Sequence, residues 1–313
     1  MRIVFWGTPE FAVPSLRALL GEGHDVVAVV CQPDRPAGRG RGVRPPPVKT
    51  VATAEAIPVF QPENARDGAF VERLRSIVPD ASVVVAYGQI LPRIVLELPP
   101  EGSINVHASL LPELRGAAPV QWAIARGHEQ TGVTIMRMDE RMDAGPILLQ
   151  TAEPIGPEET GSDLATRLSE IGAETLIEAL ALLEAGAIVA TPQDEAKATY
   201  APKIGRVDAR VDWSAPAELV ARRIRAFDAV PGAWTTLDGG ELKVYRPALA
   251  TDAGSASPGT VLDVSPADAS EGVLVGCGIG AVWIREVQAP GKRRMTASEW
   301  SRGSGIATGA RLS

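Results

Sequence analysis

Residues 2–31, RIVFWGTPEFAVPSLRALLGEGHDVVAVVC, contain the pattern that decides the fold. An apolar run at 2–6 is followed by a Gly-Thr-Pro turn at 7–9 and by apolar residues at helical spacing up to Leu20. After a glycine-rich break, a second apolar run covers 25–31. The pattern predicts a strand, a helix and a second strand, which is the building unit of a parallel sheet.

The same alternation continues as far as residue 184. It predicts further helices at 48–56, 67–77, 117–126 and 163–184, and further strands near 59 and at 81–86, 102–107, 132–138 and 147–151. Strands that alternate with helices in this way form a parallel, doubly wound sheet. We therefore expect an α/β, Rossmann-like domain over residues 1–190.

The alternation is lost after residue 190. A polar stretch with prolines and a glycine, residues 191–206, predicts a linker. One helix is expected at 217–227, and five short apolar runs follow at 233–237, 242–245, 260–264, 272–277 and 281–287. Five short strands separated by Gly, Pro, Asp and Ser predict a small β-barrel of the OB-fold type over residues 207–313.

Composition argues against a membrane protein, a secreted protein and a metal-binding protein. The longest apolar runs are only strand-sized, so no membrane span is expected, and Met1 leads into the first strand without a signal-peptide pattern. This predicts a cytoplasmic protein. Cys31 and Cys277 are the only cysteines, and the three histidines lack metal-ligand spacing, so neither a disulfide framework nor a metal site is predicted.

A basic segment lies within this acidic chain, whose formal net charge is −7. Between residues 34 and 49, Asp34 is the only acidic residue and five are basic: Arg35, Arg39, Arg41, Arg44 and Lys49. Glycines alternate with the arginines at 38–42. The segment is either a solvated connection or a chain that binds phosphates. It contains no P-loop, and the first strand is not followed by G-x-G-x-x-G, so ATPase and dinucleotide-binding functions are disfavoured.

The run NVHASLLP, residues 105–112, stands at the carboxyl end of a predicted strand, where doubly wound sheets bind ligands. Alternation along the strand places Asn105 and His107 on one face. They are either a functional pair or a local capping pair. Asp143, in a loop between two predicted strands, would on its own be a solvated turn residue. Folding of its loop over the strand end would bring a carboxylate beside the imidazole.

Several stretches together resemble the methionyl-tRNA formyltransferase family. They are QPDRPAGRG from residue 32, NVHASLLP from 105, RGAAPVQWAI from 115, TGVTIMRMDERMDAG from 131, VDW from 211 and IRAFDAVPGAW from 224. The resemblance implies a formyltransferase catalytic domain followed by a tRNA-binding barrel. It also implies transfer of a formyl group from 10-formyltetrahydrofolate to the α-amine of initiator methionyl-tRNA. By the same resemblance, Asn105 and His107 donate hydrogen bonds to the formyl oxygen, and Asp143 maintains the charge of His107 and assists proton transfer.

The resemblance also implies binding residues. Folate is expected to contact a first group, Ser109, Leu110, Leu111 and Pro112, and a facing group, Tyr87, Gly88, Gln89, Ile90 and Leu91. From sequence alone, Leu110 and Leu111 would be ordinary core residues. Contacts with tRNA are expected from Arg39, Arg41 and Arg44 in the basic segment and from Lys292, Arg293 and Arg294 in the barrel.

Two alternatives remain at this stage. One is another 10-formyltetrahydrofolate-dependent formyltransferase, which would act on a sugar-nucleotide or purine-precursor amine. The other is an inactive RNA-binding protein of the same fold. The basic segment and the C-terminal barrel favour a tRNA substrate, and retention of Asn105, His107 and Asp143 favours an enzyme. We expect a monomer that uses no metal.

Overall fold

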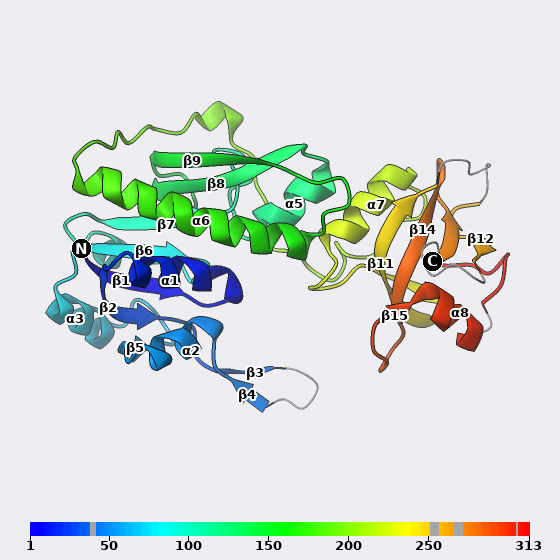
Figure 1. Ribbon diagram of the computed structural model, residues 1–313, viewed down its shortest axis with the longest axis horizontal. Helices are drawn as coiled ribbons and strands as arrows, with labels where there is room; N and C mark the ends of the chain where they lie inside the picture. Colours follow the sequence, from blue (N-terminus) through cyan, green and yellow to red (C-terminus); the bar gives the residue numbers. More distant parts are fainter. Residues whose placement is uncertain (38–41, 251–256, 266–271, 305) are drawn as a thin grey trace. The chain divides into compact units, whose positions relative to one another are not determined.

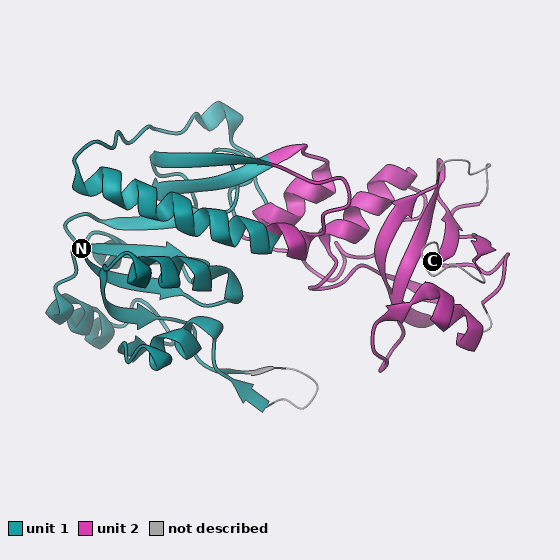
Figure 2. Cartoon of the chain, in the orientation of Figure 1, with its two compact units in different colours: residues 1–116, 131–153, 165–201 teal, residues 117–130, 154–164, 202–313 magenta. Residues whose placement is uncertain are grey.

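The computed structural model describes residues 1–37, 42–250, 257–265, 272–304 and 306–313. The chain forms two compact units (Figure 2). Unit 1 contains residues 1–116, 131–153 and 165–201, and unit 2 contains 117–130, 154–164 and 202–313. The domain limits 1–190, 191–206 and 207–313 stay a prediction, since the two units are each assembled from several stretches of chain.

The sheet of unit 1 has seven strands in the order β5-β2-β1-β6-β7-β8-β9 (Figure 1). Their bounds are β1 Arg2–Gly7, β2 Asp25–Val30, β5 Val59–Phe60, β6 Ala81–Val85, β7 Ser103–His107, β8 Gln130–Arg137 and β9 Ile147–Pro154. The first five strands of this order are parallel. Chain order reverses between β1 and β6, which is the switch point of a doubly wound sheet. The expected fold class is confirmed.

The sheet is not parallel throughout, which corrects the sequence prediction. Strand β8 is antiparallel to β7, with His107 opposite Thr134. The chain leaves β7 at its carboxyl end and enters β8 at the same end of the sheet. A helix in the connection, α5 (Pro119–Arg126), had suggested a parallel crossover. Hydrophobic periodicity reports that the helix exists but says nothing of the direction in which the next strand returns.

The helices predicted in unit 1 begin and end close to the expected positions, and two short ones, at 93–96 and 195–197, were not predicted. Together the helices are η1 Glu10–Ala12, α1 Val13–Gly21, α2 Pro47–Ala54, α3 Gly68–Ile77, α4 Arg93–Leu96, α6 Gly161–Glu184 and η2 Glu195–Lys197. Helix α6 packs on one face of the sheet (Figure 1), and a Cβ added at Gly172 would lie 3.0 Å from Val106 of β7. Because side chains alternate along a strand, the neighbours of Val106 in β7 lie on the opposite face.

An aromatic cluster lies in the core of unit 1. The Trp6 ring contacts Phe70 and Tyr87 edge to face, at centroid distances of 5.9 and 5.2 Å. Every residue of β6 and β7 is buried, as expected for central strands covered on both faces. The end of β7 is therefore fixed by packing from all sides.

The first part of the basic segment contains a short antiparallel ribbon that sequence analysis did not predict. Strand β3, Arg35–Ala37, pairs with β4, Gly42–Arg44, so that Arg35 lies opposite Arg44. Period-2 alternation cannot be recognised in strands of only three residues, which explains why the pattern was missed.

Unit 2 contains an antiparallel sheet in the order β10-β11-β14-β13-β12, with β15 on β14. Its strands are β10 Trp234–Leu237, β11 Gly240–Leu249, β12 Val261–Val264, β13 Val273–Gly276, β14 Ala281–Gln288 and β15 Met295–Thr296, and two further helices are α7 Ala217–Ala226 and α8 Ala297–Ser304. Both edge strands pair with the last residues of the chain. Val261 donates to the Ala310 carbonyl at 2.9 Å, and Thr236 donates to Ser313 at 2.8 Å. The sheet is thereby closed into a barrel, which confirms the barrel prediction.

Among the residues that the structure describes, no helix is both long and apolar enough to cross a bilayer.

Candidate active site

Strand β7 brings Asn105 and His107 to one face of the sheet, opposite the face covered by α6. Asn105 pairs with Val84 of β6 and Met136 of β8, so its backbone is held from both sides. The two side chains are buried, with exposed fractions of 8% and 6%. Strand pairing on both sides gives their relative positions little freedom. The predicted pair on one face is therefore present.

The surroundings of His107 determine its tautomer. Its Nε2 lies 3.0 Å from the carbonyl oxygen of Leu114, which can only accept a hydrogen bond, so we assign the proton of the neutral imidazole to Nε2. The Nδ1 atom lies 3.8 Å from a carboxylate oxygen of Asp143. At this distance the carboxylate pairs with His107 only when Nδ1 is also protonated. The distance is too long for a hydrogen bond, so the carboxylate faces the ring without being bonded to it.

Asp143 reaches this position because its loop folds back over unit 1. Its backbone is left-handed, with φ of 49°, a conformation that Asp tolerates better than most residues. The carboxylate accepts a hydrogen bond from the amide of Gly116 at 2.8 Å. The same residue thus contacts both the end of β7 and the segment that follows it. The structure brings all three predicted catalytic residues together.

The side chain of Asn105 has a different character. Within the described ranges, the structure shows no hydrogen-bond partner for its carboxamide. Its two polar atoms are not among the fully buried polar atoms without a partner, so the carboxamide remains reachable from outside the fold. Asn105 therefore offers an N–H donor beside His107 that the fold leaves available.

The segment expected to bind folate is held by β8 and β9. Leu111 donates its amide to Thr134 Oγ1 at 3.0 Å, and Gln150 Nε2 donates to its carbonyl at the same distance. Ser109 donates its hydroxyl to the Glu113 carbonyl at 2.6 Å. Leu111 and Ser109 are buried, and Leu110 and Pro112 are partly exposed. Thr134 and Gln150 were missed from sequence, because nothing local marks two polar side chains that support a distant loop.

The second expected folate segment divides into two parts. Tyr87 and Leu91 belong to the hydrophobic core, and burial raises the pKa of Tyr87 to about 12. Gly88 and Ile90 are exposed, and Gln89 holds a neighbouring loop by accepting from the Ala65 amide at 3.1 Å. Only the middle of this segment presents surface that a ligand could contact.

The basic residues are distributed over both units. Arg39 and Arg41 lie outside the described residues, and Arg44 is exposed on β4. Lys292, Arg293 and Arg294 are all exposed in unit 2. The Arg294 guanidinium lies 4.0 Å from the centroid of the Tyr245 ring and pairs with Glu286, so part of its charge is already compensated. In the part of the chain that the structure describes, no three His, Cys, Asp or Glu side chains are grouped to hold a metal ion.

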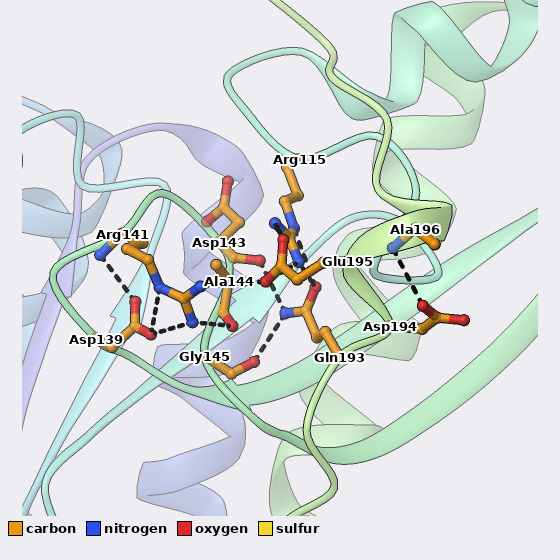
Figure 3. Close-up of polar contacts among 10 residues, drawn as sticks. All are labelled: Arg115, Asp139, Arg141, Asp143, Ala144, Gly145, Gln193, Asp194, Glu195 and Ala196. Carbon is orange, nitrogen blue, oxygen red and sulfur yellow. Dashed lines mark hydrogen bonds and ion pairs between the residues drawn. The ribbon is translucent and has the colours of Figure 1, made fainter.

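Sequence reasoning also missed three residues around the Asp143 loop, Arg115, Gln193 and Glu195 (Figure 3). Arg115 stands at the start of one of the motifs that carry the family resemblance, and this position was the only available signal. Gln193 and Glu195 fall in the stretch predicted to be a linker, so nothing in the sequence pointed to them.

Comparisons with known proteins agree with this geometry. The family model described as formyl transferase matches residues 1–180, and that described as formyl transferase, C-terminal domain, matches residues 203–305. A protein of Geobacter sulfurreducens named methionyl-tRNA formyltransferase is 47% identical over 312 residues, covering 100% of this chain and 96% of its own. One from Anaeromyxobacter sp. (strain K) with the same name is 50% identical over 306 residues, covering 97% of each.

Among solved structures, a variant of HypX from Aquifex aeolicus has the same fold. Its TM-score is 0.69 at 22% identity, with 98% of this chain and 48% of that chain covered. The full-length relatives are much closer in sequence and match both units. The chain therefore belongs to the formyl transferase family and, within it, to the methionyl-tRNA formyltransferases.

Proposed function

We propose that this protein transfers the formyl group of 10-formyltetrahydrofolate to the α-amine of the methionine carried by initiator tRNA. The observation that carries the proposal is identity of about half the residues, over both units, with proteins that bear this activity in their name. The grouping of Asn105, His107 and Asp143 supports it with chemistry that suits acyl transfer.

In the proposed reaction, the neutral amine attacks the formyl carbon and an oxyanion develops on the formyl oxygen. The Asn105 carboxamide and the protonated Nδ1 of His107 donate hydrogen bonds to that oxygen. Asp143, 3.8 Å from Nδ1, accepts the proton that the attacking nitrogen releases. The new C–N bond forms, the bond from the formyl carbon to N10 of the folate breaks, and N10 receives the proton. Tetrahydrofolate and formyl-methionyl-tRNA are the products.

Folate is proposed to lie between residues 109–112 and the exposed part of residues 87–91. The backbone of 109–112 is held in place by Thr134 and Gln150, so its groups are pre-oriented for a ligand. Tyr87 and Leu91 would support this wall from the core rather than contact the pterin directly. Gly88, Gln89 and Ile90 would contact it.

Contacts with tRNA are proposed for both units. In unit 1 they come from Arg39, Arg41 and Arg44, and in unit 2 from Lys292, Arg293 and Arg294. Arginine side chains suit phosphate binding, because each guanidinium group is always charged and donates several hydrogen bonds.

The test is a comparison of three acceptors in the presence of 10-formyltetrahydrofolate. Methionyl-tRNA should be formylated, while an amino-sugar nucleotide and glycinamide ribonucleotide should react at least about 10³-fold more slowly in kcat/KM. Preference for either small acceptor would replace the proposal with the corresponding alternative. Binding of tRNA without transfer to any acceptor would indicate the inactive RNA-binding protein.

Three further properties belong to the proposal. We propose that the protein acts in the cytoplasm, that it is a monomer, and that the transfer needs no metal in the active site. Light scattering of the purified protein tests the second. For the third, transfer to a methionine ester, which involves no RNA folding, should continue in the presence of a chelator.

A further inference from the structure

The stretch from residue 191 to residue 201, predicted to be a linker, runs along the catalytic loop and the segment that follows β7. We call it the strap. Thr191 pairs with Ile147 just beyond the Asp143 loop, and further on Tyr200 pairs with Arg115. Backbone hydrogen bonds of 2.8 and 2.7 Å join Arg115 to Thr199 and Ala201. The strap is thus attached to the chain just after the Asp143 loop and to the segment that follows β7.

Gln193 is the residue of the strap that contacts this loop. Its Nε2 donates to the carbonyl of Asp143 at 2.8 Å and to the carbonyl of Gly145 at 2.7 Å (Figure 3). Its Oε1 accepts from Nε and Nη2 of Arg115 at 3.1 and 2.8 Å. Both N–H donors and the oxygen of the Gln193 side-chain amide are therefore hydrogen-bonded. The amide cannot be reversed, because its oxygen would then face two carbonyls and its NH₂ would face a guanidinium.

Arg115 in turn is held by Glu195. The Arg115 side chain is only 2% exposed, and its Nη1 donates to Glu195 Oε2 at 2.9 Å. These hydrogen bonds keep the pKa of the Glu195 carboxyl below its usual range. A buried guanidinium without such a partner would be strongly unfavourable. Arg141, within the loop itself, also donates to Glu195 at 3.1 Å and to the carbonyl of Ala144 at 3.3 Å.

We propose that Gln193 is a positioning residue for catalysis. It holds the backbone of Asp143 in its left-handed conformation, so that the carboxylate stays in reach of His107, and Arg115 with Glu195 orients Gln193. The inference rests on the catalytic role proposed for Asp143.

The physical basis is the cost of the Asp143 conformation. A left-handed backbone is unfavourable for a residue other than glycine, even for Asp, which tolerates it better than most, so contacts must hold the loop in this state. The bond from Gln193 is made to the carbonyl of Asp143 itself, and the second bond holds the same loop two residues later. Loss of both bonds leaves the amide of Gly116 as the contact at the carboxylate, and that contact alone does not determine the backbone.

A double-mutant cycle tests the proposal. Formyl transfer to methionyl-tRNA is measured for the wild type, Gln193→Ala, Asp143→Ala and the double variant, with the thermal midpoint of each. Gln193→Ala should lower kcat about 10- to 100-fold, as expected for a misplaced catalytic group, and change both KM values less than about twofold. In the Asp143→Ala background the same substitution should have almost no further effect on kcat, because Gln193 acts through Asp143.

Two additional variants make the result specific. Gln193→Glu keeps the size of the side chain, but its carboxylate would face two carbonyl oxygens, so kcat should fall at least as far as in Gln193→Ala. This isosteric variant also replaces Gln193→Ala in the cycle if the latter does not fold. Gln130→Ala is the matched control, because Gln130 is exposed and, within the described residues, has no recorded side-chain contact. It should retain wild-type kcat.

The outcomes separate the two proposals. Wild-type turnover of Asp143→Ala would overturn the catalytic role proposed for Asp143. A large loss in Asp143→Ala with unchanged turnover in Gln193→Ala would overturn the positioning role alone. An equal loss from Gln193→Ala in both backgrounds would also overturn it, because the residue would then act on stability or on another group.

Discussion

At the scale of single residues, catalysis should depend on groups that contribute little to folding. His107→Ala and Asp143→Asn remove an imidazole and a negative charge from positions 3.8 Å apart. Each should lower kcat at least about 10²-fold, because these groups act mainly in the transition state. Circular dichroism and tRNA binding should stay near wild type. Near-normal turnover in either variant would remove that residue from the mechanism.

Tyr87 illustrates the opposite case, a polar group that contributes to stability only through its ring. Its buried hydroxyl lacks a hydrogen-bond partner among the described residues, and burial raises its pKa to about 12. Between pH values of about 10 and 12 the unfolded chain has released this proton and the native state has not, so stability falls as pH rises. Tyr87→Phe should be within about 1 kcal/mol of wild type at neutral pH and lose less stability at high pH. Urea unfolding at both pH values checks this; an equal alkaline loss in both proteins would contradict it.

At the scale of elements, the closed barrel depends on a close backbone approach at Gly259. This glycine has φ of 80°, and a Cβ added there would lie 2.1 Å from the carbonyl oxygen of Leu312. Gly239, with φ of 77°, has no atom within 4 Å of the added Cβ and serves as the control. Both alanine variants incur about 1 kcal/mol of backbone strain, but only Gly259→Ala should lose about 2 kcal/mol more. Equal melting temperatures would contradict the closure of the barrel through this contact.

The β3–β4 ribbon is the second element with a testable consequence. Arg35 lies opposite Arg44, and like charges across a strand pair are unfavourable unless an anion compensates them. We expect Arg39→Ala to lower formylation of methionyl-tRNA at least about tenfold, while slow hydrolysis of the formyl donor, which needs no RNA, stays near wild type. Arg41→Ala and Arg44→Ala should mainly reduce the salt dependence of tRNA binding by about one unit of slope for each lost phosphate contact. Equal loss of both activities in Arg39→Ala would make the segment part of the folate site.

At the scale of the whole molecule, each compact unit buries one thiol. Burial raises the pKa of Cys31, in unit 1, and of Cys277, in unit 2, to about 11. At a pH of about 8 both thiols should react with a thiol reagent at least about 10²-fold more slowly than in the unfolded chain. Labelling in increasing urea, with the modified cysteine identified by mass spectrometry, then reports the unfolding of each unit separately. Rapid modification of either cysteine in the native protein would contradict its burial.

The local sequence pattern was sufficient to predict most helices and strands of both units. It also predicted that Asn105 and His107 share one face of β7. Apolar periodicity is a property of neighbouring residues, so it predicted the strand ending at His107, and alternation alone placed Asn105 on the same face. Only the family resemblance suggested roles for Asn105, His107 and Asp143. Spacing alone could not bring Asp143 to His107, because the two residues lie 36 positions apart in the chain.

The sequence by itself determined most of the longer helices and strands and which of their residues face the core, because these properties follow from short-range periodicity. Only the tertiary structure decided the antiparallel direction of β8, the closure of the barrel by residues 310–313 and the contact of Gln193 with Asp143. Each of these depends on hydrogen bonds between segments far apart in the chain, and such bonds leave no periodic pattern in either segment. A polar stretch such as 191–201 therefore has the composition of a linker even though its backbone pairs with Ile147 and Arg115.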